Sequence, residues 1–277
     1  MPENPDEERK YYSYYNPPKT FVKSAIRVMN VLEYFYRGRQ PARAAEISRA
    51  LDLPVSSTKY LLTSLVDSGY LTFDKVSKEY FPSILFAGFA SWLAAIYPSG
   101  EILRTLAREL QSVHGNTVYV VVQHDQYMRA LIIETDSPTT PPAYDFRARI
   151  PLLGSASGIV ALSARPDSEV ADFVAQESRK LPPEFRADHT EQILTRIRQI
   201  RAQGYAVREH TLNLDGTTDA FMAVALPLPT DDKTPSMVLG ICGPTSALAG
   251  TEAFLADAMK QAVDKYHGAL QTWHGVP

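Results

Sequence analysis

Residues 52–71 read DLPVSSTKYLLTSLVDSGYL, and this stretch decides the fold of the first part of the chain. Its proline disfavours helical backbone in the residue before it, and its glycine suits the left-handed position that ends a helix. Between them the apolar residues recur at helical spacing, and Ser56 or Ser57 offers an N-cap. The stretch therefore predicts a helix over Ser56–Ser68, whose inward face carries Thr58, Leu61, Leu62, Leu65 and Val66.

The segments on either side of this helix complete a small domain. A helix is predicted over Lys23–Arg37, with its inward face at Ala25, Ile26, Met29, Leu32 and Phe35 or Tyr36. A second helix is predicted over Ala42–Leu51, with its inward face at Ala44, Ile47, Ala50 and Leu51. Two strand-like segments, 70–73 and 79–82, flank the polar turn 74–78. Short helices joined by a tight turn and followed by a hairpin indicate a winged helix-turn-helix.

The third helix and the tip of the hairpin indicate DNA binding. The segment 21–82 carries nine basic and six acidic side chains, so it is net positive although the whole chain has a net charge of −3. Hydroxyl groups bond phosphates and base edges, ammonium groups neutralise phosphates, and a helix N-terminus attracts phosphate. A module that binds protein through the same helix is the alternative. The predicted DNA contacts are Ser56, Ser57, Lys59, Tyr60, Thr63, Ser64, Lys75 and Lys78.

The composition is that of a globular protein, with 277 residues, of which 45% are hydrophobic and 21% charged. This excludes disordered and collagen-like chains, and a single cysteine, Cys242, cannot form an internal disulfide. The start, Met1–Tyr15, lacks the apolar core of a signal peptide, and the apolar run Ile84–Tyr97 is shorter than the roughly 20 residues of a bilayer span. We therefore expect a cytoplasmic protein without a membrane span, with a disordered or extended tail over 1–20.

The run Ser83–Tyr97 is apolar around nearly its whole circumference, so a helix formed there must be covered. A second copy of the chain would cover it, because helix-turn-helix proteins that read operators usually pair. Burial within its own domain is the alternative. The sequence thus predicts a DNA-binding domain over 21–82, a linker and dimerisation helix over 83–99, and a third domain over 100–277.

The third domain alternates between helix-like and strand-like patterns, which predicts an α+β fold with helices on an antiparallel sheet. The expected strands are Asn116–Gln123, Met128–Glu134, Phe221–Pro227 and Met237–Cys242. The expected helices are Glu101–Val113, Ser155–Ala164, Ser168–Lys180, Thr190–Gln203 and Glu252–Thr272.

Seven short motifs lie along the chain: SAIRV at 24–28, AEIS at 45–48, LPVSST at 53–58, LVDSGYL at 65–71, IPLLGSASG at 150–158, RAQGYAV at 201–207 and LGICGP at 239–244. Their order and spacing together resemble the IclR family of bacterial transcription regulators. The resemblance implies a homodimer or homotetramer that binds operator DNA. It also implies that the third domain is a GAF- or profilin-like effector-binding domain that senses a small organic acid or aromatic metabolite.

The chain departs from that family's pattern at several positions. The departures are Lys59-Tyr60 in place of a frequent His-Arg, Leu153 in place of His, Ile159 in place of Lys, and Arg208-Glu209 in place of two acids. The family's base contacts and usual ligand therefore do not carry over directly. Because the pocket becomes less polar, the sequence favours an aromatic acid as the effector.

The helix start that follows Pro151 is the expected anion site. Backbone N–H groups at a helix N-terminus attract a carboxylate, and Gly154, Ser155 and Ala156 lie there. A close-packed helix start is the alternative. The resemblance adds the small strand residues of the pocket, Ala223, Gly240 and Cys242. Aromatic and basic side chains complete the expected effector pocket: Tyr119, Tyr144, Phe146 and Arg208. The alternative is that the aromatic side chains pack in the core and that the arginine is solvated.

The sequence contains no recognisable enzyme site. The segment Gly154–Gly158 has Ala156 where a nucleophile elbow needs serine, and the six histidines lack the spacing of a metal site. Neither a phosphate-binding loop nor a dinucleotide fingerprint occurs. We expect no catalysis, metal or cofactor. The expected partners are operator DNA, a small carboxylate effector and further copies of the chain.

Overall fold

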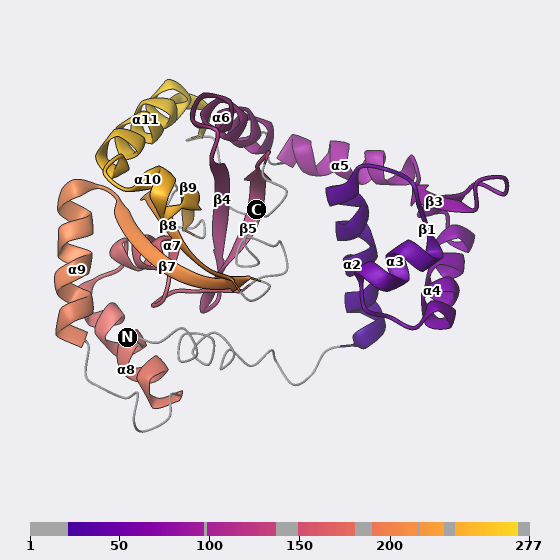
Figure 1. Cartoon of the computed structure of the whole chain (residues 1–277), viewed down its shortest axis with the longest axis horizontal. Helices are drawn as coiled ribbons and strands as arrows, with labels where there is room; N and C mark the ends of the chain where they lie inside the picture. Colours follow the sequence, from indigo (N-terminus) through magenta and orange to yellow (C-terminus); the bar gives the residue numbers. More distant parts are fainter. Residues whose placement is uncertain are drawn as a thin grey trace. The chain divides into compact units, whose positions relative to one another are not determined.

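The computed structural model of the chain describes residues 22–96, 99–136, 149–180, 190–214, 217–229 and 236–270. The chain divides after Ile96 into two compact units (Figure 1). The expected tail over 1–20 and the predicted site residues Tyr144 and Phe146 lie outside the described residues. Within the described part of the chain, no helix is long and apolar enough to cross a membrane.

The first unit combines helices with a small antiparallel sheet whose strands lie in the order β1-β3-β2. Its elements are α2 (Lys23–Gly38), β1 (Ala42–Arg43), α3 (Ala44–Ala50), α4 (Val55–Asp67), β2 (Leu71–Phe73), β3 (Glu79–Pro82) and α5 (Leu85–Ile96). Its core is made by Val31, Phe35, Ile47, Leu62, Leu65 and Leu71. These elements form the predicted winged helix-turn-helix.

Helix α4 keeps its predicted inward face but not its predicted cap. The N-cap is Pro54, without a side-chain hydrogen bond, so Ser56 and Ser57 lie inside the first turn. The hydroxyl of buried Thr58 donates to the carbonyl of Pro54 at 3.1 Å. Gly69, at a φ of 82°, adopts the left-handed conformation expected after the helix. The apolar side of α4 therefore fixes the helix on the core of the unit.

The segment predicted to start the second helix forms strand β1 instead, which pairs with β3. The backbone of Arg43 is extended, and its N–H donates to the carboxylate of Glu46 at 2.7 Å. This bond caps α3 and moves its first residue to Ala44. The helix also ends before Leu51, and Ala50 is exposed, so its predicted inward position is wrong.

Helix α2 buries Phe35, one of the residues predicted to face inward, but exposes most of the others. Val31 and Phe35 are buried, whereas Ile26, Met29 and Tyr36 are exposed. The helix carries two apolar stripes, and periodicity alone does not choose between them. The stripe that faces α3 and β3 is the one that is buried.

The second unit holds an antiparallel sheet with the strand order β6-β5-β4-β9-β8-β7. Its strands are β4 (Thr117–His124), β5 (Tyr127–Glu134), β6 (Ile150–Pro151), β7 (Ala206–Leu214), β8 (Thr217–Pro227) and β9 (Met237–Pro244). Its helices are α6 (Ser99–His114), α7 (Ala156–Ser163), α8 (Asp167–Lys180), α9 (Thr190–Gln203), α10 (Thr245–Leu248), α11 (Glu252–Lys265) and α12 (His267–Leu270).

Helices cover both faces of this sheet. Alternate residues of a strand point to opposite faces, so each strand contributes apolar side chains to both helix–sheet contacts. One face, which includes Tyr119 and Cys242, packs against α7, α8 and α9. The other face, which includes Val120 and Ile241, packs against α6, α10, α11 and α12. The predicted α+β class with helices flanking an antiparallel sheet is confirmed.

Three elements of this unit were not predicted, namely β6, β7 and α10. Strand β7 lies at the edge of the sheet and reads AVREHTLNL, so polar residues interrupt the apolar alternation that marks a strand. The closing helix ends at Lys265, where Tyr266 leaves helical conformation, instead of continuing to Thr272. The remaining predicted elements agree with the structure apart from their ends.

An ion-pair cluster joins the start of α8 to α9. The Asp167 carboxylate accepts from Arg201 Nη1 at 2.6 Å and from Arg198 Nη2 at 3.1 Å. Arg201 also donates to the carbonyl of Ser163 at 2.8 Å, so it ties the end of α7 to the same point. The hydrogen bonds from Arg201, and then those from Arg198, lower the pKa of Asp167 below its ordinary value.

This lowered pKa predicts a pH-dependent contribution to stability. A carboxyl whose pKa is lower in the folded state stabilises the fold above its unfolded pKa, and this contribution is lost as pH falls through the folded pKa. The Asp167→Asn variant should therefore unfold at lower urea concentration at pH 7, and the difference from the wild type should shrink on acidification toward pH 3. Asp172→Asn is the control, since Asp172 lies on the same helix without an ion pair among the described residues. An equal, pH-independent difference for both variants would contradict the prediction.

Candidate functional site

The outer side of α4 is open to solvent, as predicted. Its side chains are carried by a helix whose other side is anchored in the core by Leu62 and Leu65. Tyr60 is 79% exposed, and Ser57 is half-buried. The exposed predicted residues of this face are Ser56, Lys59, Tyr60, Thr63 and Ser64.

The hairpin between β2 and β3 presents Lys75 and Lys78 to solvent. The carboxylate of Asp74 accepts two backbone N–H groups of the turn, at 2.7 and 3.4 Å, and these bonds lower the pKa of Asp74. Arg43, which the sequence did not single out, donates from Nε to the carbonyl of Ser77 at 3.1 Å. The tip of the hairpin is therefore held by internal bonds, and the ammonium groups of Lys75 and Lys78 are exposed on it.

Five predicted effector residues lie on one face of the large sheet. Cys242 pairs with Ala223, and Ala223 pairs with Arg208 on the next strand. Tyr119 pairs with Gly240 two residues further along the same face. Four of them are buried and Arg208 is half-buried. Pairing thus brings together residues that are more than 100 positions apart in the sequence.

The start of α7 packs against this face, and the predicted anion-site residues Gly154, Ser155 and Ala156 are buried there. Ser155 is the N-cap: its hydroxyl accepts the N–H of Gly158 at 2.9 Å and donates to the carbonyl of Pro151 at 2.8 Å. The Ser155 side chain therefore caps one N–H of the helix start, that of Gly158.

A buried pair of hydroxyl groups joins α7 to the sheet. Ser157 Oγ lies 3.2 Å from Tyr119 Oη. Gly240 leaves space for the tyrosine ring, because a Cβ at this position would lie 2.2 Å from Tyr119 Cζ. The small residues predicted for this region thus allow the close approach of an aromatic ring and a helix start.

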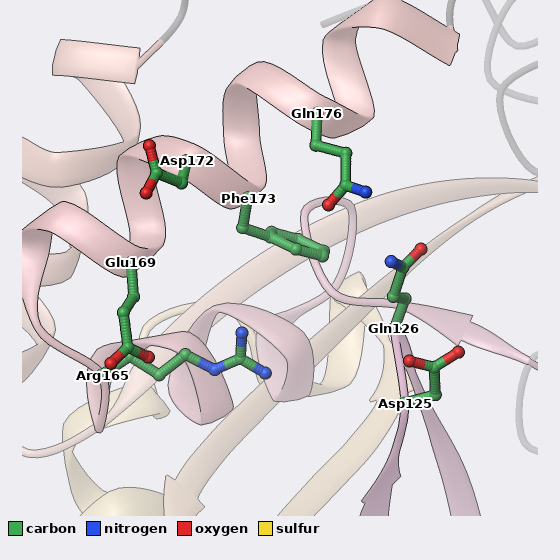
Figure 2. Close-up of a pocket in the computed structure, with 7 residues that line it drawn as sticks. All are labelled: Asp125, Gln126, Arg165, Glu169, Asp172, Phe173 and Gln176. Carbon is green, nitrogen blue, oxygen red and sulfur yellow. The ribbon is translucent and has the colours of Figure 1, made fainter.

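A separate cleft of about 350 Å³ lies between α8 and the turn that joins β4 to β5 (Figure 2). Figure 2 shows Arg165 extending below the ring of Phe173, and its guanidinium carbon is 5.7 Å from the ring centroid. None of the predicted effector residues lines this cleft. Its lining residues are Asp125, Gln126, Arg165, Glu169, Asp172, Phe173 and Gln176. No motif links these residues, so sequence reasoning missed them.

Models of two protein families match the chain. A model described as the IclR helix-turn-helix domain matches residues 24–75. A second model, described as the bacterial transcriptional regulator IclR C-terminal, matches residues 100–267 and alone covers more than half of the chain. The two matches fall on the winged helix-turn-helix and on the α+β unit.

Individual proteins resemble the chain in sequence or in fold. The Pca regulon regulatory protein of Pseudomonas putida is 21% identical over 192 residues, which are 69% of this chain and 66% of that protein. The IclR structure from Thermotoga maritima has a TM-score of 0.59 at 16% identity, over 90% of this chain and 99% of that one. An IclR homologue from Microbacterium hydrocarbonoxydans, complexed with 4-hydroxybenzoate, has a TM-score of 0.55 at 18% identity, also over 90% and 99%. The chain therefore belongs to the IclR family of DNA-binding bacterial transcriptional regulators.

Proposed function

We propose that this protein is a cytoplasmic, homodimeric regulator that binds its operator through α4 and the hairpin and responds to a small aromatic acid. The observation that carries the DNA-binding part is the exposed hydroxyl and ammonium face of α4 beside the two lysines of the hairpin. A ligand changes operator binding only if it binds the two states of the regulator unequally. The family is one of regulators, so no catalytic step is proposed.

The proposed effector site is the start of α7. The N–H of Gly158 is bonded to Ser155, whereas no acceptor among the described residues is found for the N–H groups of Ala156 and Ser157. Both residues are buried, and buried N–H groups are nearly always paired. A carboxylate is a suitable acceptor because the helix N-terminus carries partial positive charge. The hydroxyls of Ser157 and Tyr119, which are bonded to each other, place further polar groups beside these N–H groups.

Two relatives support an aromatic acid. One is named a regulator of the Pca regulon, and another was solved as a complex with 4-hydroxybenzoate. The sheet face next to α7 offers the Tyr119 ring and apolar small residues to an aromatic ring, with Arg208 as a counter-charge at the edge. We infer that the effector's carboxylate binds the start of α7 and that its aromatic ring contacts the sheet face beside that helix.

Thermal unfolding with added 4-hydroxybenzoate tests this site, because a ligand that binds the folded state raises the unfolding temperature with concentration. We expect stabilisation of the wild type and about tenfold weaker binding by Ser157→Ala, which removes one buried hydroxyl. Ser163→Ala is the matched control, since its hydroxyl bonds within the other end of α7. Equal affinity of the wild type and Ser157→Ala, or no stabilisation by this acid, benzoate or 3,4-dihydroxybenzoate, would contradict the proposal.

The homodimer is proposed from the apolar side chains that the first unit leaves exposed. Helix α5 packs Phe86 near Tyr70 but exposes a second apolar side. Helix α2 exposes Ile26 and Met29, which the sequence placed inward. A second copy of the chain is the expected cover, because two copies bring two recognition helices to a symmetric operator. The exposed residues are Val22, Ile26, Met29, Ile84, Leu85, Phe89 and Trp92.

Trp92→Asp should convert the dimer to a monomer, since it puts a carboxylate into the proposed apolar interface. Trp92 is 60% exposed within one chain, so the fold of the monomer should survive. Sedimentation velocity measures the change in mass. Val76→Asp is the control, because Val76 is also an apolar residue, 92% exposed, but lies at the tip of the hairpin. A Trp92→Asp protein that stays dimeric would refute this interface.

A further inference from the structure

Helix α4 exposes apolar groups on the side that we propose faces DNA. Tyr60 is 79% exposed and Val55 is 47% exposed, while the rest of this side carries hydroxyl groups and one ammonium group. Val55 lies one turn before Lys59, and Tyr60 follows Lys59, so around the helix Lys59 lies between the two apolar side chains. The helix that carries them is fixed on the core, because Leu62 is fully buried.

The same helix lacks most side chains that read bases by paired hydrogen bonds. Arginine or lysine reads guanine, asparagine or glutamine reads adenine, and a carboxylate accepts from cytosine. The sequence of α4, VSSTKYLLTSLVD, contains no Arg, Asn, Gln or Glu, and its one acid is the last residue. The Ser64 hydroxyl donates to the carbonyl of Tyr60 at 3.0 Å, so it is engaged within the helix. Besides the exposed hydroxyls of Ser56 and Thr63, Lys59 is the only exposed base-reading donor of this helix.

The major groove presents one apolar group, the C5 methyl of thymine. A tyrosine ring or a valine side chain on a recognition helix gains by covering this methyl, since both lose contact with water. We propose that α4 reads thymine methyl groups through Tyr60 and Val55, and that the half-site bases facing these residues are A·T pairs. This inference rests on the proposed placement of α4 in the major groove.

Uracil substitution tests the inference, because uracil keeps the pairing of thymine and lacks only the methyl group. The probe is the footprinted half-site from the protein's own upstream region, with each thymine replaced in turn. We expect wild-type binding to weaken about fourfold at each contacted thymine, the effect of one buried methyl-sized group. Thymines outside the footprint are the control and should have no effect.

Two variants assign the effect to Tyr60. Tyr60→Ala should bind the unsubstituted operator about tenfold more weakly and lose the response to uracil at the thymine that faces the ring. Tyr60→Phe should keep that response, since the ring remains. Because Tyr60 is exposed, both variants should unfold at the wild-type temperature.

Three results would overturn the inference or its basis. Uracil that weakens wild-type binding at no half-site thymine, or a Tyr60→Ala protein that keeps the full uracil response, would overturn the thymine reading while leaving the proposed function intact. A wild-type protein that forms no operator-specific complex would overturn the proposed function itself, and this inference with it.

Discussion

Lys59→Glu should lower the affinity of the protein for its operator by on the order of 100-fold, because it removes one phosphate-neutralising charge and puts a carboxylate against the phosphates. Lys59 lies on the exposed side of α4, and the described residues provide no hydrogen bond or ion pair to it, so the fold should be unaffected. The dissociation constant at several salt concentrations measures the effect, and the slope of its logarithm against the logarithm of salt should fall by about one.

Lys23→Glu is the matched control for this prediction. It makes the same charge change in the same unit, at an exposed residue of α2 outside the proposed contact face. It should change operator affinity only slightly, through the net charge. Equal losses for both variants would show that affinity follows the overall charge and that α4 has no special role. If Lys59→Glu left operator binding unchanged, the helix would contact something other than DNA.

Gly158→Ala should destabilise the second unit by about 3 kcal/mol or more, the upper range for forcing an extra group into a packed core. A Cβ at this position would lie 2.3 Å from the carbonyl oxygen of Leu152 and 2.4 Å from its Cα. Both contacts are with backbone, which cannot turn aside as a flexible side chain can. The free energy of unfolding from urea titration measures the loss.

Gly100→Ala makes the same chemical change in helix α6, where an added Cβ would have nothing within 4 Å. Alanine has the higher helix propensity, so this variant should be as stable as the wild type or slightly more stable. A Gly158→Ala protein as stable as Gly100→Ala would contradict the described packing of α7 on the preceding turn.

Helix α4 could be predicted because its signals are local. A proline before it, a glycine after it and an apolar stripe define both its ends and its buried side within 52–71. The buried side of α2 could not be predicted in the same way, since the helix has two apolar stripes and contact with α3 and β3 decides between them. Strand β1 was also missed, because its two residues are extended only through pairing with β3.

The predicted effector residues illustrate a different limit. Motif resemblance and residue type selected Tyr119, Gly240 and Cys242, and strand pairing places them side by side. Their tight packing with α7 depends on tertiary contacts, such as the fit of the Tyr119 ring over Gly240, that no local pattern encodes. The cleft beside Arg165 is assembled from a turn, a connection and a helix, so only the fold reveals it.

We expect α4 and the hairpin to bind a specific DNA sequence. A mobility-shift titration of the purified wild-type protein on its own upstream region, beside a scrambled duplex of equal length and composition, tests this expectation. As salt increases, binding to the scrambled duplex should disappear while the complex with the upstream region persists. Equal affinity for the two duplexes at every salt concentration would contradict it.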